Sequence, residues 1–370
     1  RKIKVGKLPG VPENAFVNDI KADLHDKNTV YIALDNHKVG DYKPYLLKST
    51  NKGKSWKSIT SNLPDKHLVW RVVQDHIKPE LMFLGTEFGI FVTVNGGKKW
   101  IELDGNIPNI SFRDLAIQKR ENDLVAASFG RGIFILDDYS SLRNITEKSL
   151  EQEAILFKTR KAWWYIQKYS LGFDEKGSAG AQHYAAKNPE FGATFTYYLK
   201  DDIKSLKDIR QKKEQALTKK DANKDIDFPG WDAVESERRQ EKATILLVVK
   251  DSQGNVVRRV PSNASKGINR VTWNLKYPSL NEISDAKSHK VDEEFEGVMA
   301  APGNYTVTLY KQLDGKVDKL SEPVAFEVVR MNESKMQEAT PEQVVAFRQE
   351  ITNVQREKSA ISNVLKTTEI

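Results

Sequence analysis

The sequence STNKGKSW at residues 49–56 returns as TVNGGKKW at residues 93–100, after 44 residues. The two copies share the pattern Ser/Thr-x-Asn-x-Gly-x-x-Trp. Such an Asn can bond its own backbone in an Asx turn, and the Gly tolerates a positive φ. The Trp then covers the turn with a large apolar ring. The pattern therefore predicts a corner between two strands, built by Ser49, Asn51, Gly53, Trp56, Thr93, Asn95, Gly97 and Trp100.

A second phrase repeats at nearly the same distance. GIFV at 89–92 returns as GIFI at 132–135, after 43 residues. Short β-rich runs fill each unit, at 29–34, 45–49, 68–73, 81–86, 90–93, 112–117, 124–128 and 133–136. Four short strands in about 43 residues is the spacing of a β-propeller blade. Residues 1–140 are therefore predicted to form about three blades.

The repeated motif resembles the Asp-box, or BNR repeat, of sialidase-like and VPS10/sortilin-like propellers. DYKPYL at 41–46, GTEFG at 85–89 and FGRGIFILDD at 129–138 look like the last blades of large secreted bacterial proteins, often labelled glycosyl hydrolases. Asn51 and Asn95 stand where the family pattern prefers Asp. The resemblance spans about residues 10–330. It implies an extracytoplasmic location in the periplasm, at the cell surface or secreted, and further blades on an N-terminal region.

Three blades do not make a closed ring, because propellers close with about four to eight blades. Unpaired sheet edges and open flanks promote aggregation. We therefore expect the remaining blades to lie on an upstream segment or on another chain, and these blades are the first predicted partner. A protein or glycan ligand is the second.

The sequence after residue 140 predicts a β architecture different from the blades of residues 1–140. Residues 141–153 are predicted to be a linker, and 154–330 an immunoglobulin-like β-sandwich with Trp273 and Tyr305 in its core. This part is similar to the FlgD-type Ig-like domain that follows the propeller in the same bacterial family. Residues 200–242 contain 23 charged residues among 43, which predicts an exposed helical insertion, and 281–296 predicts a polar loop.

Residues 331–370 change class again, toward a helix. Thr340, Pro341 and Gln343 suit the N-cap, N1 and N3 positions of a helix start. One row with alternating spacings of 3 and 4 follows, interrupted by Lys358 and otherwise apolar at Val344, Phe347, Ile351, Val354, Ile361 and Leu365. Such a seam needs a partner helix. The segment is therefore predicted to be half of a helical hairpin, and the fold as a whole to be mainly β.

Composition argues against several functional classes. The net charge of +7 divides into +4 for residues 1–140 and +3 for 141–370, so no basic tail or face points to nucleic acid. No apolar run reaches the ~18 residues of a membrane span. The chain has no cysteine, and its six histidines form no His-x-x-x-His pair. We therefore expect no metal, no cofactor and no transmembrane segment in this sequence.

The best candidates for ligand binding are polar residues in loops that occupy equivalent places in successive blades. Glu87 and Arg131 lie in two such loops, and His37 and Asp41 lie in a polar loop of the preceding blade. Loops of this kind commonly form the ligand face of a propeller. These four residues are the predicted binding rim; the alternative is that they make salt bridges between blades or bonds within turns.

The sequence favours a non-catalytic binding or scaffold portion of a secreted or cell-envelope protein, whose propeller face captures a peptide, protein or glycan. A sialidase-like glycoside hydrolase is one alternative, with its catalytic centre mostly in blades outside this sequence. Arg71, Arg113, Arg131, Tyr31 and Glu87 are the residue types it requires, but no spacing specifies a catalytic set, so none is assigned. A structural subunit of an outer-membrane or secretion complex is another alternative.

Overall fold

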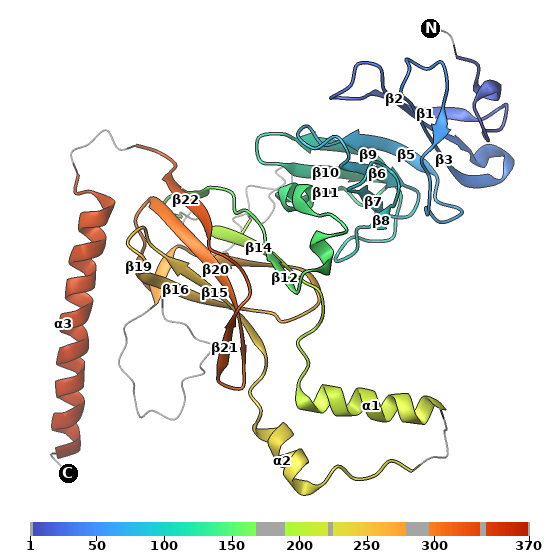
Figure 1. Cartoon of the computed structure of the whole chain (residues 1–370). Helices are drawn as coiled ribbons and strands as arrows, with labels where there is room; N and C mark the ends of the chain where they lie inside the picture. Colours follow the sequence, from blue (N-terminus) through green and yellow to red (C-terminus); the bar gives the residue numbers. More distant parts are fainter. Residues whose placement is uncertain (1–2, 168–188, 221–224, 279–295, 334–337, 369–370) are drawn as a thin grey trace. The chain divides into compact units, whose positions relative to one another are not determined.

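The computed structural model is mainly β, with a long helix near the C-terminal end of the chain (Figure 1). It describes residues 3–167, 189–220, 225–278, 296–333 and 338–368. The chain forms two units, Arg1–Leu150 and Glu151–Ile370.

The first unit contains successive antiparallel sheets in which each strand pairs with the next along the chain. We call them blades 1, 2 and 3. Blade 1 consists of β1 (Phe16–Ala22), β2 (Val30–Asn36), β3 (Asp41–Ser49) and β4 (Lys57–Ser58). Blade 2 consists of β5 (Val69–Gln74), β6 (Met82–Thr86), β7 (Ile90–Thr93) and β8 (Ile101–Glu102). Blade 3 consists of β9 (Phe112–Gln118), β10 (Asp123–Ser128) and β11 (Ile133–Leu136).

The blades pack face to face through apolar side chains. Between blades 1 and 2 the core includes Tyr31, Ala33, Leu46, Val69, Val72, Met82, Leu84, Phe91 and Trp100. On the other face of blade 2, the ring of Phe83 lies edge-on to that of Tyr139, 5.0 Å between centroids. Gly85 is required there, because a Cβ would come within 2.6 Å of the Phe112 carbonyl oxygen in blade 3. The blades thus stack in sequence order.

Both copies of the repeated motif build the same turn. Ser49 Oγ accepts from Gly53 N at 2.9 Å, and Thr93 Oγ1 accepts from Gly97 N at 3.0 Å. Asn51 Oδ1 accepts from the backbone N of Ser55 at 2.9 Å, and Asn95 Oδ1 from that of Lys99 at 3.0 Å. Gly53 and Gly97 have φ of 75° and 86°, which a residue with a side chain rarely adopts.

Asn95→Ala should lower the free energy of unfolding of the first unit by about 1–2 kcal/mol, because it removes the acceptor for the Lys99 amide and the Thr93 hydroxyl. Urea unfolding followed by hydrogen exchange of residues 69–102 would measure the effect. Asn109→Ala, in an exposed loop and without a positive φ, is the control. A loss equal to that of the control would contradict a structural role for the motif.

A buried carboxylate ties the end of the first unit to blade 2. Asp75, which is fully buried, follows β5 and binds the Arg143 guanidinium through both oxygens, at 2.7 and 2.9 Å. It also accepts from the Tyr139 hydroxyl at 2.7 Å and the Lys78 amide at 2.7 Å. Tyr139–Asn144 is a 3-10 helix, so the predicted linker at 141–153 begins inside this unit.

The second unit contains two main sheets. One has the order β12 (Ala154–Leu156), β14 (Ala193–Leu199), β17 (Gly267–Trp273). The other has the order β13 (Ala162–Trp164), β22 (Val324–Arg330), β20 (Gly303–Leu313), β15 (Thr244–Lys250), β16 (Val256–Ser262), and β21 (Lys316–Lys319) pairs with β20. β18 (Lys276–Pro278) pairs with β19 (Glu296–Met299). The shared core includes Phe195, Ile245, Leu247, Trp273, Tyr305, Val307, Leu309 and Phe326.

Helices account for the polar and C-terminal segments of this unit. The charged insertion contains α1 (Leu206–Lys220) and α2 (Trp231–Arg239), joined by an Arg210–Glu237 ion pair at 2.7 Å. The predicted loop at 281–296 lies almost wholly outside the described residues. α3 (Pro341–Thr368) begins with the predicted cap, in which Thr340 N donates to Gln343 Oε1 at 2.9 Å. Its apolar row is exposed, by 62% at Phe347, 65% at Val354 and 61% at Ile361.

Candidate functional site

The strands of each blade are antiparallel to their neighbours. The loop between the second and third strands therefore lies at the same end of the blade as the start of the first strand. His37 lies in the β2–β3 loop, Glu87 in the β6–β7 loop and Arg131 in the β10–β11 loop. Backbone hydrogen bonds hold two of these loops to the segments before β5 and β9, from Glu87 N to Leu68 O at 3.0 Å and from Phe129 N to Ser111 O at 2.8 Å. We call this end the loop face; its residues are His37, Trp70, Glu87, Ser111, Arg113, Phe129 and Arg131.

Glu87 is held between blades 2 and 3. Its Oε2 accepts from Trp70 Nε1 at 2.8 Å and from the Ser111 hydroxyl at 3.1 Å. The guanidinium of Arg113 comes within 3.5 Å of the same oxygen. Glu87 is one of the predicted binding residues, and it also makes contacts between blades, as the alternative interpretation predicts.

Arg113 is the cation at the centre of the loop face. Its guanidinium lies 3.6 Å from the centroid of the Trp70 ring and 5.5 Å from that of Phe129, and its Nε donates to Ser111 Oγ at 2.8 Å. The Arg113 side chain is 43% exposed, and Phe129 is 72% exposed. Stacking on Trp70 and the bond to Ser111 hold the guanidinium in place while leaving part of it accessible.

The structure separates the roles of His37 and Asp41. His37 contacts the buried Asp35 through Nδ1 and lies edge-on to the Trp70 ring, 5.7 Å between centroids. Asp41 instead accepts from the Tyr45 hydroxyl at 2.6 Å within its own strand. Burial raises the pKa of Asp41, but the bonds from Tyr45 and the Lys43 amide outweigh it, so the net pKa is lowered. Asp41 is therefore engaged locally, and His37 adjoins the Trp70 cluster.

Arg131 is exposed at the tip of the β10–β11 loop, between two glycines with φ of 81° and 78°. It shares this loop with Phe129, whose ring faces Arg113. Of the predicted rim, His37 and Glu87 therefore meet through Trp70, and Arg131 lies on the adjoining loop. Sequence reasoning missed Trp70, Ser111 and Phe129 as members. The 43-residue offset was the available signal, because it makes Trp70 the equivalent of Arg113.

A line of alternating charges crosses the first strands of the blades. Arg71 Nη1 lies 3.1 Å from Asp19 Oδ1 in blade 1, and Arg71 Nε lies 2.8 Å from Asp114 Oδ1 in blade 3. Asp19, Arg71 and Asp114 occupy equivalent positions in the repeat. Each directly follows the irregularity in the pairing of the first strand of its blade. We call this line the charge ladder. It explains Arg71 as an inter-blade contact.

Tyr31 and Glu87, two of the residue types that a sialidase-like site requires, are not brought together. The Tyr31 hydroxyl donates to Asp23 Oδ2 at 2.7 Å, and Tyr31 is only 2% exposed. Tyr31 lies near the start of β2, whereas Glu87 follows the end of β6, so they occupy opposite ends of their blades. Burial, followed by the Asp23 contact, raises the pKa of Tyr31, which makes it a poor nucleophile.

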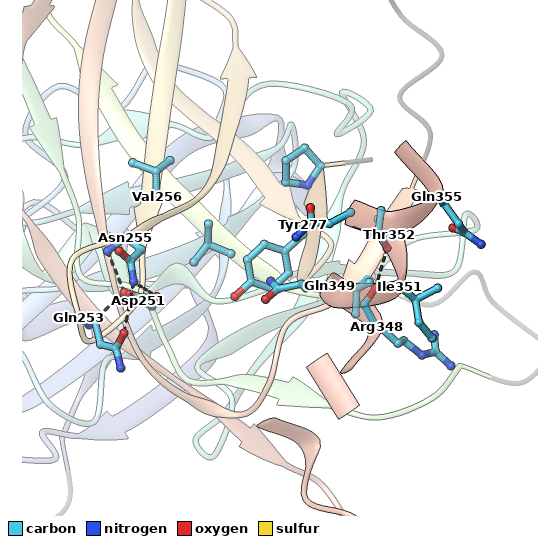
Figure 2. A pocket seen from close by; sticks show the side chains of 15 residues that line it. Asp251, Gln253, Asn255, Val256, Tyr277, Arg348, Gln349, Ile351, Thr352 and Gln355 are labelled. Carbon is cyan, nitrogen blue, oxygen red and sulfur yellow. Dashed lines mark hydrogen bonds between the residues drawn. The ribbon is translucent and has the colours of Figure 1, made fainter. Parts of the chain in front are cut away.

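The second unit has a hollow of about 970 Å³ lined by the turn at 251–255, the β18–β19 pair and α3. Figure 2 shows Tyr277 of β18 beside Gln349 and Thr352 of α3. Asp251 lines the opposite side, but its Oδ1 accepts from the amides of Gln253 and Asn255 at 2.9 and 2.8 Å. That carboxylate is therefore used by its own turn rather than turned to a ligand in the hollow.

The part of the chain that the structure describes contains no group of three or more His, Cys, Asp or Glu side chains placed to hold a metal ion. Among the helices of the same part, none combines the length and the hydropathy that a membrane crossing requires.

No protein-family model and no curated protein matches the chain. Among solved structures it is similar to PorZ, a surface component of the type-IX secretion system of Porphyromonas gingivalis, with 12% identity, 85% of this chain and 30% of that one covered, and a TM-score of 0.27. It is also similar to the BT4673 extracellular domain from B. thetaiotaomicron, with 10% identity, 86% and 31% covered, and a TM-score of 0.26.

An ancestral GH74 enzyme matches at 12% identity, with 84% of this chain and 44% of that one covered, and a TM-score of 0.29. The chain therefore spans less than half the length of these three proteins. At such identities and TM-scores, the likenesses decide neither a family nor an activity.

Proposed function

We propose that the first unit is part of a larger β-propeller, outside the cytoplasm, whose loop face captures a ligand without catalysis. The observation that carries the binding role is the convergence on this face of side chains from three blades. His37 contacts Trp70, Arg113 lies between Trp70 and Phe129, and Glu87 joins Trp70 to Ser111. The rigid strands beneath preorganise this cluster, and part of it is exposed to solvent.

The larger propeller is supported by repeat-equivalent positions. In blade 2, Val69 and Val72 are 0% and 1% exposed, whereas their equivalents in blade 1, Val17 and Ile20, are 43% and 60% exposed. An apolar pair is thus buried where a preceding blade is present and exposed where it is not. The face of blade 3 that points away from blade 2, which we call its outer face, shows the same contrast. The exposed apolar faces of blades 1 and 3 are therefore surfaces on which further blades would pack.

The chemistry of the loop face favours a peptide or protein carboxylate over a sugar. Sugars stack on open aromatic faces, but Trp70 is only 9% exposed and is covered by Arg113, and the exposed Phe129 ring has the same guanidinium over one face. The accessible groups are the Arg113 and Arg131 guanidiniums and the Phe129 ring, which suit an acidic side chain beside an apolar one. We therefore propose an acidic peptide segment as the ligand.

Selection of random phage-displayed peptides on the full chain tests this proposal. We expect the selected sequences to be rich in Asp and Glu. Arg131→Ala should weaken their binding by about tenfold or more, measured by calorimetry, because it removes a charge-assisted contact. The matched control is Arg120→Ala, whose side chain is 81% exposed in the β9–β10 connection at the opposite end of blade 3. Equal weakening by both variants, or selection of neutral peptides, would refute the acidic ligand.

The second unit is proposed to be the Ig-like brace of the propeller, and α3 to be one half of a helical hairpin. The support is the shared core of its two sheets and the exposed apolar row of α3. The glycoside hydrolase alternative makes a different prediction for the same chain. Turnover of aryl glycosides that is lost in Glu87→Gln would favour it over binding.

A further inference from the structure

The outer face of blade 3 carries apolar side chains that the internal repeat marks as contact positions. Ile90 and Val92 of β7 are 2% and 4% exposed, and Ile90 lines a small hollow together with side chains of blade 3. Their equivalents in β11, Ile133 and Ile135, are 67% and 59% exposed. Since identical places in the repeat differ this much in burial, the exposed pair lies where a following blade would pack.

The charge ladder ends at blade 3. Asp19, Arg71 and Asp114 alternate in sign across blades 1, 2 and 3. Asp19 is 4% exposed at its side chain, and Arg71 is 28% exposed, with an acid on each side. Asp114 has Arg71 beside it, and its side chain is still 61% exposed. The next position of the ladder therefore faces a carboxylate.

We propose that the outer face of blade 3 binds a further blade of the same repeat whose first strand places an arginine or lysine against Asp114. Its occupant would be a blade on another segment of a longer polypeptide, because the three blades described here follow one another in a single chain. This inference rests on the proposed larger propeller, and it adds the chemistry by which the next blade is recognised.

Charge disfavours the simplest competing occupant, a second copy of this chain. If blade 1 of a copy packed on blade 3, Asp19 of that copy would take the ladder position opposite Asp114, because first-strand equivalents meet at each blade contact. Two carboxylates in contact repel, and like charges at an interface disfavour the wrong partner. A blade with a basic residue at that position continues the alternation instead.

Photo-crosslinking in the native gene product tests the proposal. Benzoyl-phenylalanine is placed at Ile135, or at Ile77 as a control, since Ile77 is 59% exposed in the β5–β6 connection away from this face. Mass spectrometry then identifies the peptide that is attached. We expect Ile135 to cross-link to another four-stranded repeat of the same polypeptide, with Arg or Lys at the position equivalent to Arg71. Ile77 should not yield this peptide.

Charge reversal tests the ladder directly. Asp114→Lys should lower the Ile135 cross-link by about tenfold or more, because the incoming cation would meet a cation. Asp65→Lys reverses an exposed acid away from the ladder and should leave it unchanged. Thermal unfolding of both variants checks that blade 3 remains folded. An unchanged cross-link in folded Asp114→Lys would overturn the proposal.

The identity of the attached peptide separates this inference from the proposed propeller. A blade without a basic residue opposite Asp114 would overturn the ladder and leave the propeller intact. A cross-link to residues 16–22 of a second copy, to a separate polypeptide, or to a sequence that is no blade would overturn the inference. A cross-link to a sequence that is no blade, or the absence of any cross-link, would overturn the proposed larger propeller as well.

Discussion

Asp75→Ala will lower the free energy of unfolding of the first unit by about 3–5 kcal/mol, the loss typical when one partner of a buried ion pair is removed. The substitution leaves the Arg143 guanidinium, only 14% exposed, without the carboxylate that holds it. It also removes the acceptor for the Tyr139 hydroxyl, whose ring packs on Phe83. Residues 139–145 should therefore lose their packing against blade 2.

Hydrogen exchange during urea unfolding measures this loss for the first unit separately from the second. Asp65→Ala is the matched control, since Asp65 is an exposed carboxylate of the same unit, and it should change stability by less than about 0.5 kcal/mol. Similar losses in the two variants would mean that the buried network adds nothing to stability.

The same network predicts a pH dependence. Burial raises the pKa of Asp75, but the bonds from Arg143, the Lys78 amide and Tyr139 lower it more, to about 2 from 3.8. Because the folded-state pKa is the lower one, the stabilisation is complete above about pH 4 and disappears as the pH falls through about 2. The stability gap between wild type and Asp75→Ala should shrink by about 2 kcal/mol over this window. A gap that is constant with pH would contradict it.

Trp273→Ala will destabilise the second unit by about 3–5 kcal/mol, the cost of deleting a large core ring. Trp273 is 1% exposed, its ring lies 5.5 Å from Tyr305 and 6.3 Å from Phe326, and its Nε1 donates to Lys276 O at 2.9 Å. Removal of the indole opens a cavity between the two sheets and removes this hydrogen bond.

Trp231→Ala is the matched control, because this Trp is 79% exposed on α2 and its loss should cost less than about 0.5 kcal/mol. Trp273→Phe should fall between the two, since it refills most of the cavity but lacks the indole donor. Scanning calorimetry of the full chain would measure all three. Equal transitions for Trp273→Ala and Trp231→Ala would show that the ring does not hold the sheets together.

Local chemistry explains why the repeat could be found in the sequence. Asn95, Gly97 and Thr93 bond within one turn, so their pattern survives as a short motif. The apolar row of α3 is likewise visible, because a helix places residues 3 and 4 apart on one face. The 43-residue offset also marks the loops that contain Glu87 and Arg131 as equivalent, although it does not show what these two residues touch.

The long-range contacts had no comparable signal. Asp75 and Arg143 are 68 residues apart, and Arg143 lies in a segment that composition alone marked as a linker. Arg113 stacks on Trp70 only because blades 2 and 3 pack so closely that a Cβ at Gly85 would meet the Phe112 carbonyl. Asp41, an equally plausible polar loop residue, bonds within its own strand instead.

The sequence by itself determined the strands, the turns and the blade period, since these depend on neighbours within a few residues. Only the tertiary structure decided which charged side chains meet, because Asp19, Arg71 and Asp114 come together through blade packing. The tertiary structure also decided which face of the packed blades remains uncovered. Ile90 and Ile133 occupy the same place in the repeat, and a blade covers the first but leaves the second exposed.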